Sequence, residues 1–102
     1  MKVRLSSEAR QDLIAIGDYI ARDNPPRAQS FVAELAGKCA SLGQMPKAHP
    51  LVPRYAQKGV RRRGHDKYQI FYRADDNEVF VIRVLHGARD YAALLFPEDD
   101  PQ

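Results

Sequence analysis

The second half of the chain is rich in arginine and tyrosine residues that could bind anionic groups or act on them. They are Arg61, Arg63, Tyr68, Tyr72, Arg73, Arg83, Arg89 and Tyr91. An arginine guanidinium binds a phosphate or a carboxylate through two hydrogen bonds, and a tyrosine ring can stack on a nucleic-acid base. In a ribonuclease, arginine would stabilise charge on the reacting phosphate while a tyrosine, arginine or lysine moved the proton.

Positive charge is concentrated in one part of the 102 residues, whose formal net charge is +3 at pH 7. Seven lysines and arginines lie between Arg54 and Arg73, against the single acid Asp66. A one-sided basic segment on a small domain predicts an acidic partner, either nucleic acid or an acidic protein segment. A solvated basic hairpin that only keeps the protein soluble explains the pattern equally well.

Several of these residues also have a purely structural interpretation. Tyr68 and Tyr72 alternate with aliphatic residues in a predicted strand, which favours a place in the core over a stacking surface. Arg83 interrupts the apolar run 79–85, so it needs a carboxylate, an opening at the sheet edge or a ligand. We favour a structural ion pair for Arg83.

The usual arrangements of catalytic and metal-binding residues are missing from the sequence. It contains no Gly-rich phosphate loop, no nucleophile elbow and no spaced pair of metal-binding histidines. His49, His65 and His86 are far apart in the chain, and we interpret each as a structural or surface residue. Cys39, the only cysteine, excludes an internal disulfide and predicts a buried thiol on an apolar helix face. We therefore expect no metal and no other cofactor.

Composition predicts one compact domain in water. Hydrophobic residues make up 44% of the chain and charged residues 28%, which is typical of a folded soluble domain. No apolar run approaches the roughly 20 residues that span a bilayer. The charged first residues lack the apolar stretch of a secretory signal, so the expected compartment is the cytoplasm.

The first half of the chain predicts a strand followed by two helices. Residues 1–5 alternate as a half-buried strand does, and Ser6 and Ser7 offer an N-cap to a helix in which Gly17 marks a close approach to a neighbour. Asn24 and the two prolines after it break that helix and cap a second one, which runs to about residue 42 and stops at Gly43. Residues 44–53 contain three prolines and predict an ordered loop.

The second half predicts three strands and a short helical turn. The strands are expected at 59–63, 67–73 and 78–85, and the turn at 91–96. The order β-α-α-β-β-β predicts an α+β fold, with a helical hairpin packed on one face of a mainly antiparallel sheet. Residues 1–96 form the single domain, and the acidic residues 97–102 form a tail that we expect to be flexible.

Over nearly its whole length the chain resembles the RelE/ParE superfamily of type II toxins, and within it the ParE branch. The residues that carry the resemblance follow one another in the order and spacing of that family. They are Ala9–Leu13 with Ile16, Tyr19 and Ile20; Asn24–Ala28 with Phe31 and Leu35; Leu42 and Pro46; Val60 and Arg61; Tyr68–Tyr72; and Val81–Asp90.

The resemblance implies a small cytoplasmic toxin that causes growth arrest and is held inactive by a cognate, ParD-like antitoxin encoded alongside. It implies that the complex is a heterotetramer or larger and binds operator DNA through the antitoxin. ParE-type members inhibit DNA gyrase by protein–protein contact and are not enzymes. Two alternatives stay open: a RelE-like, ribosome-dependent mRNA endonuclease, and a remnant of the fold that binds an antitoxin without being toxic.

The candidate contact residues come from the basic cluster. Arg61, Arg63, Arg83 and Arg89 are expected to contact acidic partners, with His86 and Tyr91 at the rim of that surface. If the chain were an endonuclease, Arg61, Arg83 and Tyr91 would be the catalytic candidates, for phosphate charge and proton transfer.

Overall fold

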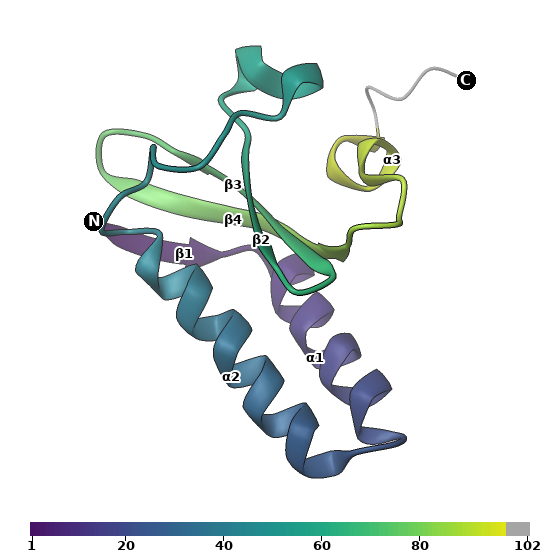
Figure 1. Ribbon diagram of the computed structural model, residues 1–102. Helices are drawn as coiled ribbons and strands as arrows, with labels where there is room; N and C mark the ends of the chain where they lie inside the picture. The colour runs from purple at the N-terminus through teal and green to yellow at the C-terminus, as the bar shows by residue number, and fades with distance from the viewer. Residues whose placement is uncertain (98–102) are drawn as a thin grey trace.

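The computed structural model describes residues 1–97 and forms a sheet with a long helical hairpin on one side (Figure 1). The acidic residues 98–102, most of the expected tail, lie outside the described residues. The observed element order confirms the predicted β-α-α-β-β-β fold. The elements are β1 (Lys2–Leu5), α1 (Ser7–Ala21), α2 (Pro25–Ser41), the 3-10 helix η1 (Pro53–Lys58), β2 (Arg61–His65), β3 (Tyr68–Ala74), β4 (Glu78–His86) and α3 (Tyr91–Leu95).

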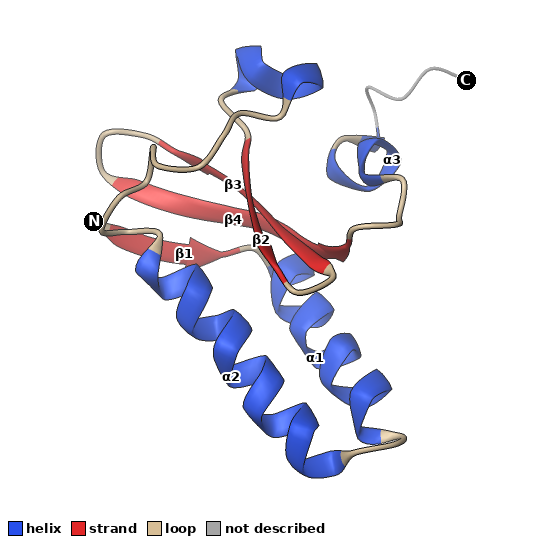
Figure 2. Ribbon diagram, viewed as in Figure 1, coloured by secondary structure: helices blue, strands red, loops and turns tan. Residues whose placement is uncertain are grey.

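The four strands form one sheet in the order β1-β4-β3-β2 (Figure 2). β3 pairs antiparallel with both β2 and β4, while β1 pairs parallel with β4. The sheet is therefore mainly antiparallel, as predicted. β4 has a partner on each side, in agreement with its largely apolar sequence.

Both long helices begin where the sequence places their caps. The Ser6 hydroxyl accepts a hydrogen bond from the Ala9 N–H at 2.9 Å, and the Asn24 side chain accepts one from the Arg27 N–H at 3.2 Å. These bonds satisfy backbone donors that have no partner inside the helix. Figure 1 shows that the tip of the hairpin, around residues 22–24, projects beyond the sheet.

The main core lies between the hairpin and one face of the sheet. Ile70 and Tyr72 of β3 are fully buried there, against Phe31 and Leu35 of α2. The core interpretation of Tyr72 is thus confirmed, and Tyr68 packs, partly buried, against the same cluster. A Cβ on Gly17 would lie 3.1 Å from the Val32 side chain, so the close approach expected at this glycine is to α2.

The opposite face of the sheet carries a second, smaller core that the sequence did not predict. η1 and α3 cover it, with Tyr55 donating a hydrogen bond from its hydroxyl to the Ala92 carbonyl at 3.3 Å. Phe71 of β3 is buried in this cluster. The strand expected at 59–63 begins two residues later, at Arg61. Gly59 instead ends η1 with a φ of 72°, and Val60 is buried in the second core.

A bulge in β4 changes which residues share a face. The pairing with β3 shifts between Phe71, opposite Arg83, and Tyr72, opposite Val81, which leaves Ile82 as the extra residue. Val84 therefore joins Val81 in the main core, and Leu85 joins the second core. Strict alternation along β4 would place Leu85 on the face of Val79 and Val81, so it fails after the bulge.

Gly43 follows α2 as expected, but a glycine is needed there because of a close backbone contact and not because of a left-handed backbone conformation. It has no positive φ, so it does not end the helix with the left-handed residue common at helix ends. A Cβ at this position would lie 2.1 Å from the Met1 carbonyl oxygen. The Met1 amino group also donates a hydrogen bond to the Gly43 carbonyl at 3.1 Å, so the glycine lets the start of β1 approach the end of α2.

Candidate functional site

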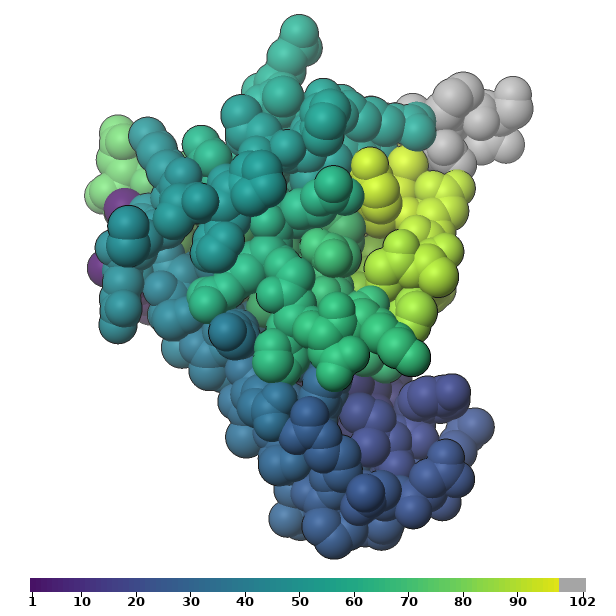
Figure 3. Space-filling view, in the orientation of Figure 1, coloured from purple at the N-terminus to yellow at the C-terminus, as the bar shows by residue number. Residues whose placement is uncertain are grey.

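A groove of about 560 Å³ lies between the helical hairpin and the ends of β3 and β4. Its volume is within the range of roughly 300–1,000 Å³ that ligand-binding pockets occupy. In Figure 3 the surface steps inward between the β2–β3 hairpin (green) and the helical hairpin (blue and purple). Its apolar lining includes Ile16 and Tyr19 of α1, Phe31 of α2 and Tyr68 of β3.

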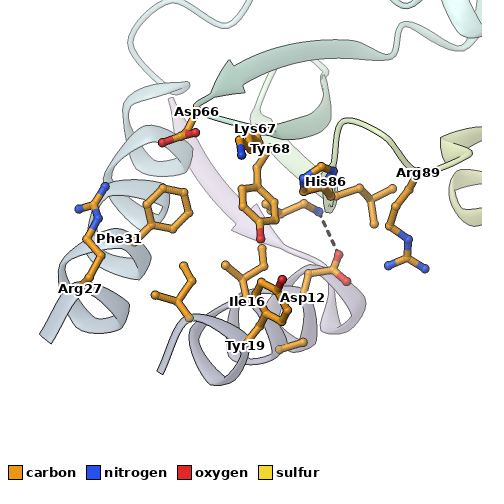
Figure 4. Close-up of a pocket in the computed structure, with 14 residues that line it drawn as sticks. Asp12, Ile16, Tyr19, Arg27, Phe31, Asp66, Lys67, Tyr68, His86 and Arg89 are labelled. Carbon is orange, nitrogen blue, oxygen red and sulfur yellow. Dashed lines mark hydrogen bonds between the residues drawn. The ribbon is translucent and has the colours of Figure 1, made fainter. Parts of the chain in front are cut away.

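Rings from α2, β3 and β4 lie along one wall of the groove (Figure 4). Tyr68 lies between Phe31, at 5.6 Å between ring centroids, and His86, at 5.3 Å. His65 packs on the other side of Phe31 at 5.3 Å. Burial, assisted by Tyr19 and Asp66, raises the pKa of Tyr68, so its phenol keeps its proton at neutral pH. The wall therefore presents apolar ring faces together with the protonated Tyr68 hydroxyl.

The tautomer of His86 follows from one hydrogen bond. Its Nδ1 accepts the Ala88 N–H at 3.1 Å, and a ring nitrogen that accepts a hydrogen bond carries no proton. In the neutral ring the proton is then on Nε2. His86 is thus a hydrogen-bond donor at the edge of the groove.

Three positively charged side chains surround the groove. Figure 4 shows Arg27 at one end and Arg89 at the other, with Lys67 on the β2–β3 turn between them. Arg27 pairs with Glu34, while Lys67 and Arg89 have no ion pair among the residues that the structure describes. Asp66, at the turn, is the acid on this rim. A groove with an apolar wall and a cationic rim suits an amphipathic segment that carries acidic residues.

Glu34 connects α2 to the β2–β3 hairpin. Its carboxylate bonds to the Arg27 guanidinium and, at 2.9 Å, to Nε2 of His65. The hydrogen bonds from Arg27 and then from His65 lower the pKa of Glu34. This exposed network holds the turn that carries Lys67 against the helix beneath it.

Arg83 forms the structural ion pair that the sequence favours. Its Nε and Nη2 each donate to an Asp12 carboxylate oxygen at 2.8 Å, and Asp12 also accepts the Val84 N–H at 2.9 Å, the dashed line in Figure 4. The Asp12 hydrogen bonds raise the pKa of Arg83, although burial opposes them. β1 pairs with β4 only as far as Val81, so Arg83 reaches around an open edge of the sheet toward α1.

Arg61 and Arg63 lie elsewhere, beside the end of α2. Arg61 donates to the His49 carbonyl at 2.7 Å, and Arg63 donates to the Ser41 hydroxyl at 2.6 Å and the Lys38 carbonyl at 3.1 Å. Neither lines the groove. Arg61 thus braces the backbone of the 43–52 segment, and Arg63 braces the C-terminal end of α2.

Tyr91 lies on the opposite face of the sheet from the groove. It is the first residue of α3, and its ring packs 5.2 Å from that of Phe71 in the second core. Of the six candidate contact residues, the structure therefore brings only His86 and Arg89 together in the groove. The three nuclease candidates Arg61, Arg83 and Tyr91 lie in three different environments.

Sequence reasoning overlooked several groove residues. Lys67 was counted only as part of the basic segment, and Phe31, Tyr19 and Ile16 only as helical or family positions. The sequence pattern gave no separate signal for Tyr19, which is 64% exposed in the structure although it lies three positions after Ile16 on α1. The order of the strands in the sheet brings α1 close to Tyr68 and His86, and the local sequence pattern does not contain that order.

No metal site or membrane span is found in residues 1–97. No group of three His, Cys, Asp or Glu side chains within this range could hold a metal ion. No helix in the same range is long and apolar enough to cross a membrane. The groove and its charged rim are thus the main candidate site in the described structure.

Comparison with known proteins identifies relatives in sequence and in structure. The sequence profile of the ParE toxin of the type II toxin–antitoxin system parDE matches residues 3–91. None of the curated proteins matches the sequence. Among solved structures, the chromosomal ParDE toxin–antitoxin system of P. aeruginosa is similar in fold, with a TM-score of 0.72 at 21% identity, over 84% of this chain and 95% of that chain.

A second solved structure has the same fold and a slightly higher sequence identity. It is the RelBE2 toxin–antitoxin complex of Mycobacterium tuberculosis, with a TM-score of 0.59 at 26% identity. The match covers 83% of this chain and 95% of that chain.

Proposed function

This chain belongs to the family of ParE toxins of type II toxin–antitoxin systems, and from that premise we propose that it arrests growth by inhibiting DNA gyrase through protein–protein contact. We propose further that a cognate, ParD-like antitoxin encoded alongside neutralises it in the cytoplasm. The match of the family profile to residues 3–91 is the observation that carries this proposal.

The groove is the proposed site for the antitoxin. Its apolar wall of Phe31 and Tyr68 would take the apolar side of an amphipathic segment. Lys67 and Arg89 would then pair with acidic residues on the rim, where the partner's charges stay partly in water and chiefly affect the rate of association. Of the candidate contact residues, His86 and Arg89 are assigned to this partner.

Charge reversal on the rim tests the antitoxin site. The variant Lys67→Glu with Arg89→Glu should bind the antitoxin at least about tenfold more weakly in calorimetry, because two attractive pairs become repulsive. The matched control is Lys2→Glu with Arg10→Glu, two exposed basic residues on β1 and α1 outside the groove lining, which change the net charge equally. Equal weakening in both variants would contradict the site.

The geometry does not favour a nuclease built on Arg61, Arg83 and Tyr91, and gyrase inhibition stays our proposal. Arg83 is bound to Asp12, and Tyr91 packs its ring on Phe71 across the sheet. General acid–base catalysis needs its groups within hydrogen-bond reach of one substrate position. A defined cut in mRNA when the protein meets translating ribosomes would nevertheless establish the nuclease.

The assembly is part of the same proposal. Two toxins and two antitoxins, or a larger complex, would bind operator DNA through the antitoxin. Light scattering on the co-expressed complex gives the stoichiometry directly. A one-to-one complex that neither assembles further nor binds operator DNA would contradict this part.

A further inference from the structure

We infer that five basic residues beside the outer edge of β2 form a site for the phosphate groups of a nucleic-acid backbone. They are Lys38, Lys47, His49, Arg61 and Arg63, and we call them the β2 basic cluster. This site lies outside the groove and requires neither the antitoxin nor gyrase. It would let the toxin contact nucleic acid itself.

The two arginines are held in position for an anion. They occupy alternate positions of β2, opposite Tyr72 and Ile70, so both point to the helix side and lie roughly 7 Å apart along the strand. Each uses Nη1 for the bonds to backbone and to Ser41 described above, which fixes the guanidinium and leaves its other donors for a ligand. Figure 3 shows the 43–52 segment (teal) and β2 (green) side by side on this face.

The positive charge of the β2 basic cluster is not compensated by acids. Within the described chain, neither Arg61 nor Arg63 forms an ion pair, in contrast to Arg27 and Arg83. The C-terminal end of α2, which Arg63 touches, supplies only about half a negative charge. A bound anion would therefore supply the counter-charge for these arginines.

The pKa of His49 depends on the positive charges around it. Burial, and then the charges of Arg63 on β2 and Lys38 on α2, lower its pKa. Its ring meets the edge of Tyr72 at 6.3 Å, so the neighbours facing it are cationic or neutral. A bound phosphate would offset the cations and raise the pKa of His49.

The geometry favours a phosphate backbone over a peptide. An acidic peptide could gain affinity by adding a strand to the β2 edge, but that edge is already occupied: Arg62 donates its N–H to the Pro50 carbonyl at 3.1 Å, and Leu51 forms a bridge with Arg61. Exposed Met45 and Leu51 flank the cluster, so an acidic protein segment is the competing occupant. The whole chain holds sixteen lysines and arginines against thirteen acidic residues, and this net charge of +3 favours a polyanion at long range.

Salt-dependent binding of a labelled 20-base-pair DNA duplex to the full chain, followed by fluorescence anisotropy, tests the inference. Lys38→Glu with Lys47→Glu should weaken binding about tenfold or more at low salt and reduce the slope of log K against log salt by roughly two, since each phosphate contact contributes about 0.9. Within residues 1–97 neither lysine side chain forms a hydrogen bond or an ion pair, so the fold should persist. Lys2→Glu with Arg10→Glu is again the control of equal charge and should change affinity far less.

Histidine NMR gives a second, local readout. The duplex should shift the His49 signals and raise the pKa of that ring, while the signals of His86 stay in place. Inorganic phosphate alone should produce the same shift only at much higher concentration. Equal weakening in both charge-reversal variants, a shift with phosphate but no duplex binding, or tighter binding of polyglutamate than of the duplex would each overturn the inference.

Discussion

At the scale of single residues, Asp12 determines what Arg83 can do. Its carboxylate takes two guanidinium donors and one backbone N–H, and the two side chains are 11% and 18% exposed. Arg83 also lies 3.4 Å from the Leu94 carbonyl, so the pair connects α1 to α3 past the edge of β4. Arg83, for which the sequence left a ligand open but favoured an ion pair, thus has a structural role.

Removing the charge of Asp12 should therefore destabilise the fold. We expect Asp12→Asn to lower the free energy of unfolding by roughly 3 kcal/mol, because the guanidinium stays largely buried without its counter-charge. Asp18→Asn, at an exposed position on the same helix, is the control and should have little effect. Urea denaturation measures both, and a loss as small as that of the control would show that the pair is dispensable.

The Glu34 network predicts a specific dependence of stability on pH. Because Arg27 and His65 lower the pKa of this carboxyl in the folded state, its stabilising effect is present above the ordinary pKa of glutamate and is lost as pH falls through the folded value. The melting temperature of the wild type should therefore fall more steeply below about pH 5 than that of Glu34→Gln. Parallel curves for the two proteins in thermal melts would contradict this role.

Residue pattern alone was enough to expect an ion pair at Arg83, but not to name its partner. Asp12 is 71 positions away, and only the packing of α1 on β4 brings the two together. The same is true of the groove. His86 and Arg89 were recognised as candidates, whereas Phe31 and Lys67 reach them through the tertiary fold.

At the scale of elements, two glycines near the end of α2 make opposite predictions. Gly43→Ala should destabilise the protein, because the new Cβ would lie 2.1 Å from the Met1 carbonyl oxygen and one of the two backbones must move. Gly37→Ala should stabilise it by about 0.5–1 kcal/mol, since this helical position has nothing within 4 Å of the added carbon. Denaturant unfolding measures the change in the free energy of unfolding for both variants. Equal changes would contradict the close approach of β1 to α2.

The helices and strands were predictable because their patterns are strong and local. Ser6, Asn24 and the prolines mark the helix ends, and the structure confirms both caps. The second core was not predictable in the same way. The six residues of η1 have no repeating pattern, and because of the bulge at Ile82 simple alternation assigns Leu85 to the main core instead of the second core.

At the scale of the whole molecule, the two proposed binding sites and the second core occupy different places. The groove opens between the helical hairpin and the sheet, and the β2 basic cluster lies beside the other end of α2. Tyr91 and α3 cover the opposite face. An antitoxin in the groove would therefore leave the β2 basic cluster accessible, and the two sites can be altered separately by charge reversal.

The most direct test of the central claim is DNA cleavage by purified gyrase, with and without this protein. The proposed function predicts that linear DNA accumulates when the protein is added, and that the antitoxin suppresses this product. Lys67→Glu with Arg89→Glu should make the suppression require more antitoxin. An unchanged cleavage pattern at concentrations that arrest growth, together with mRNA cut at ribosomes, would contradict the proposal and establish the nuclease instead.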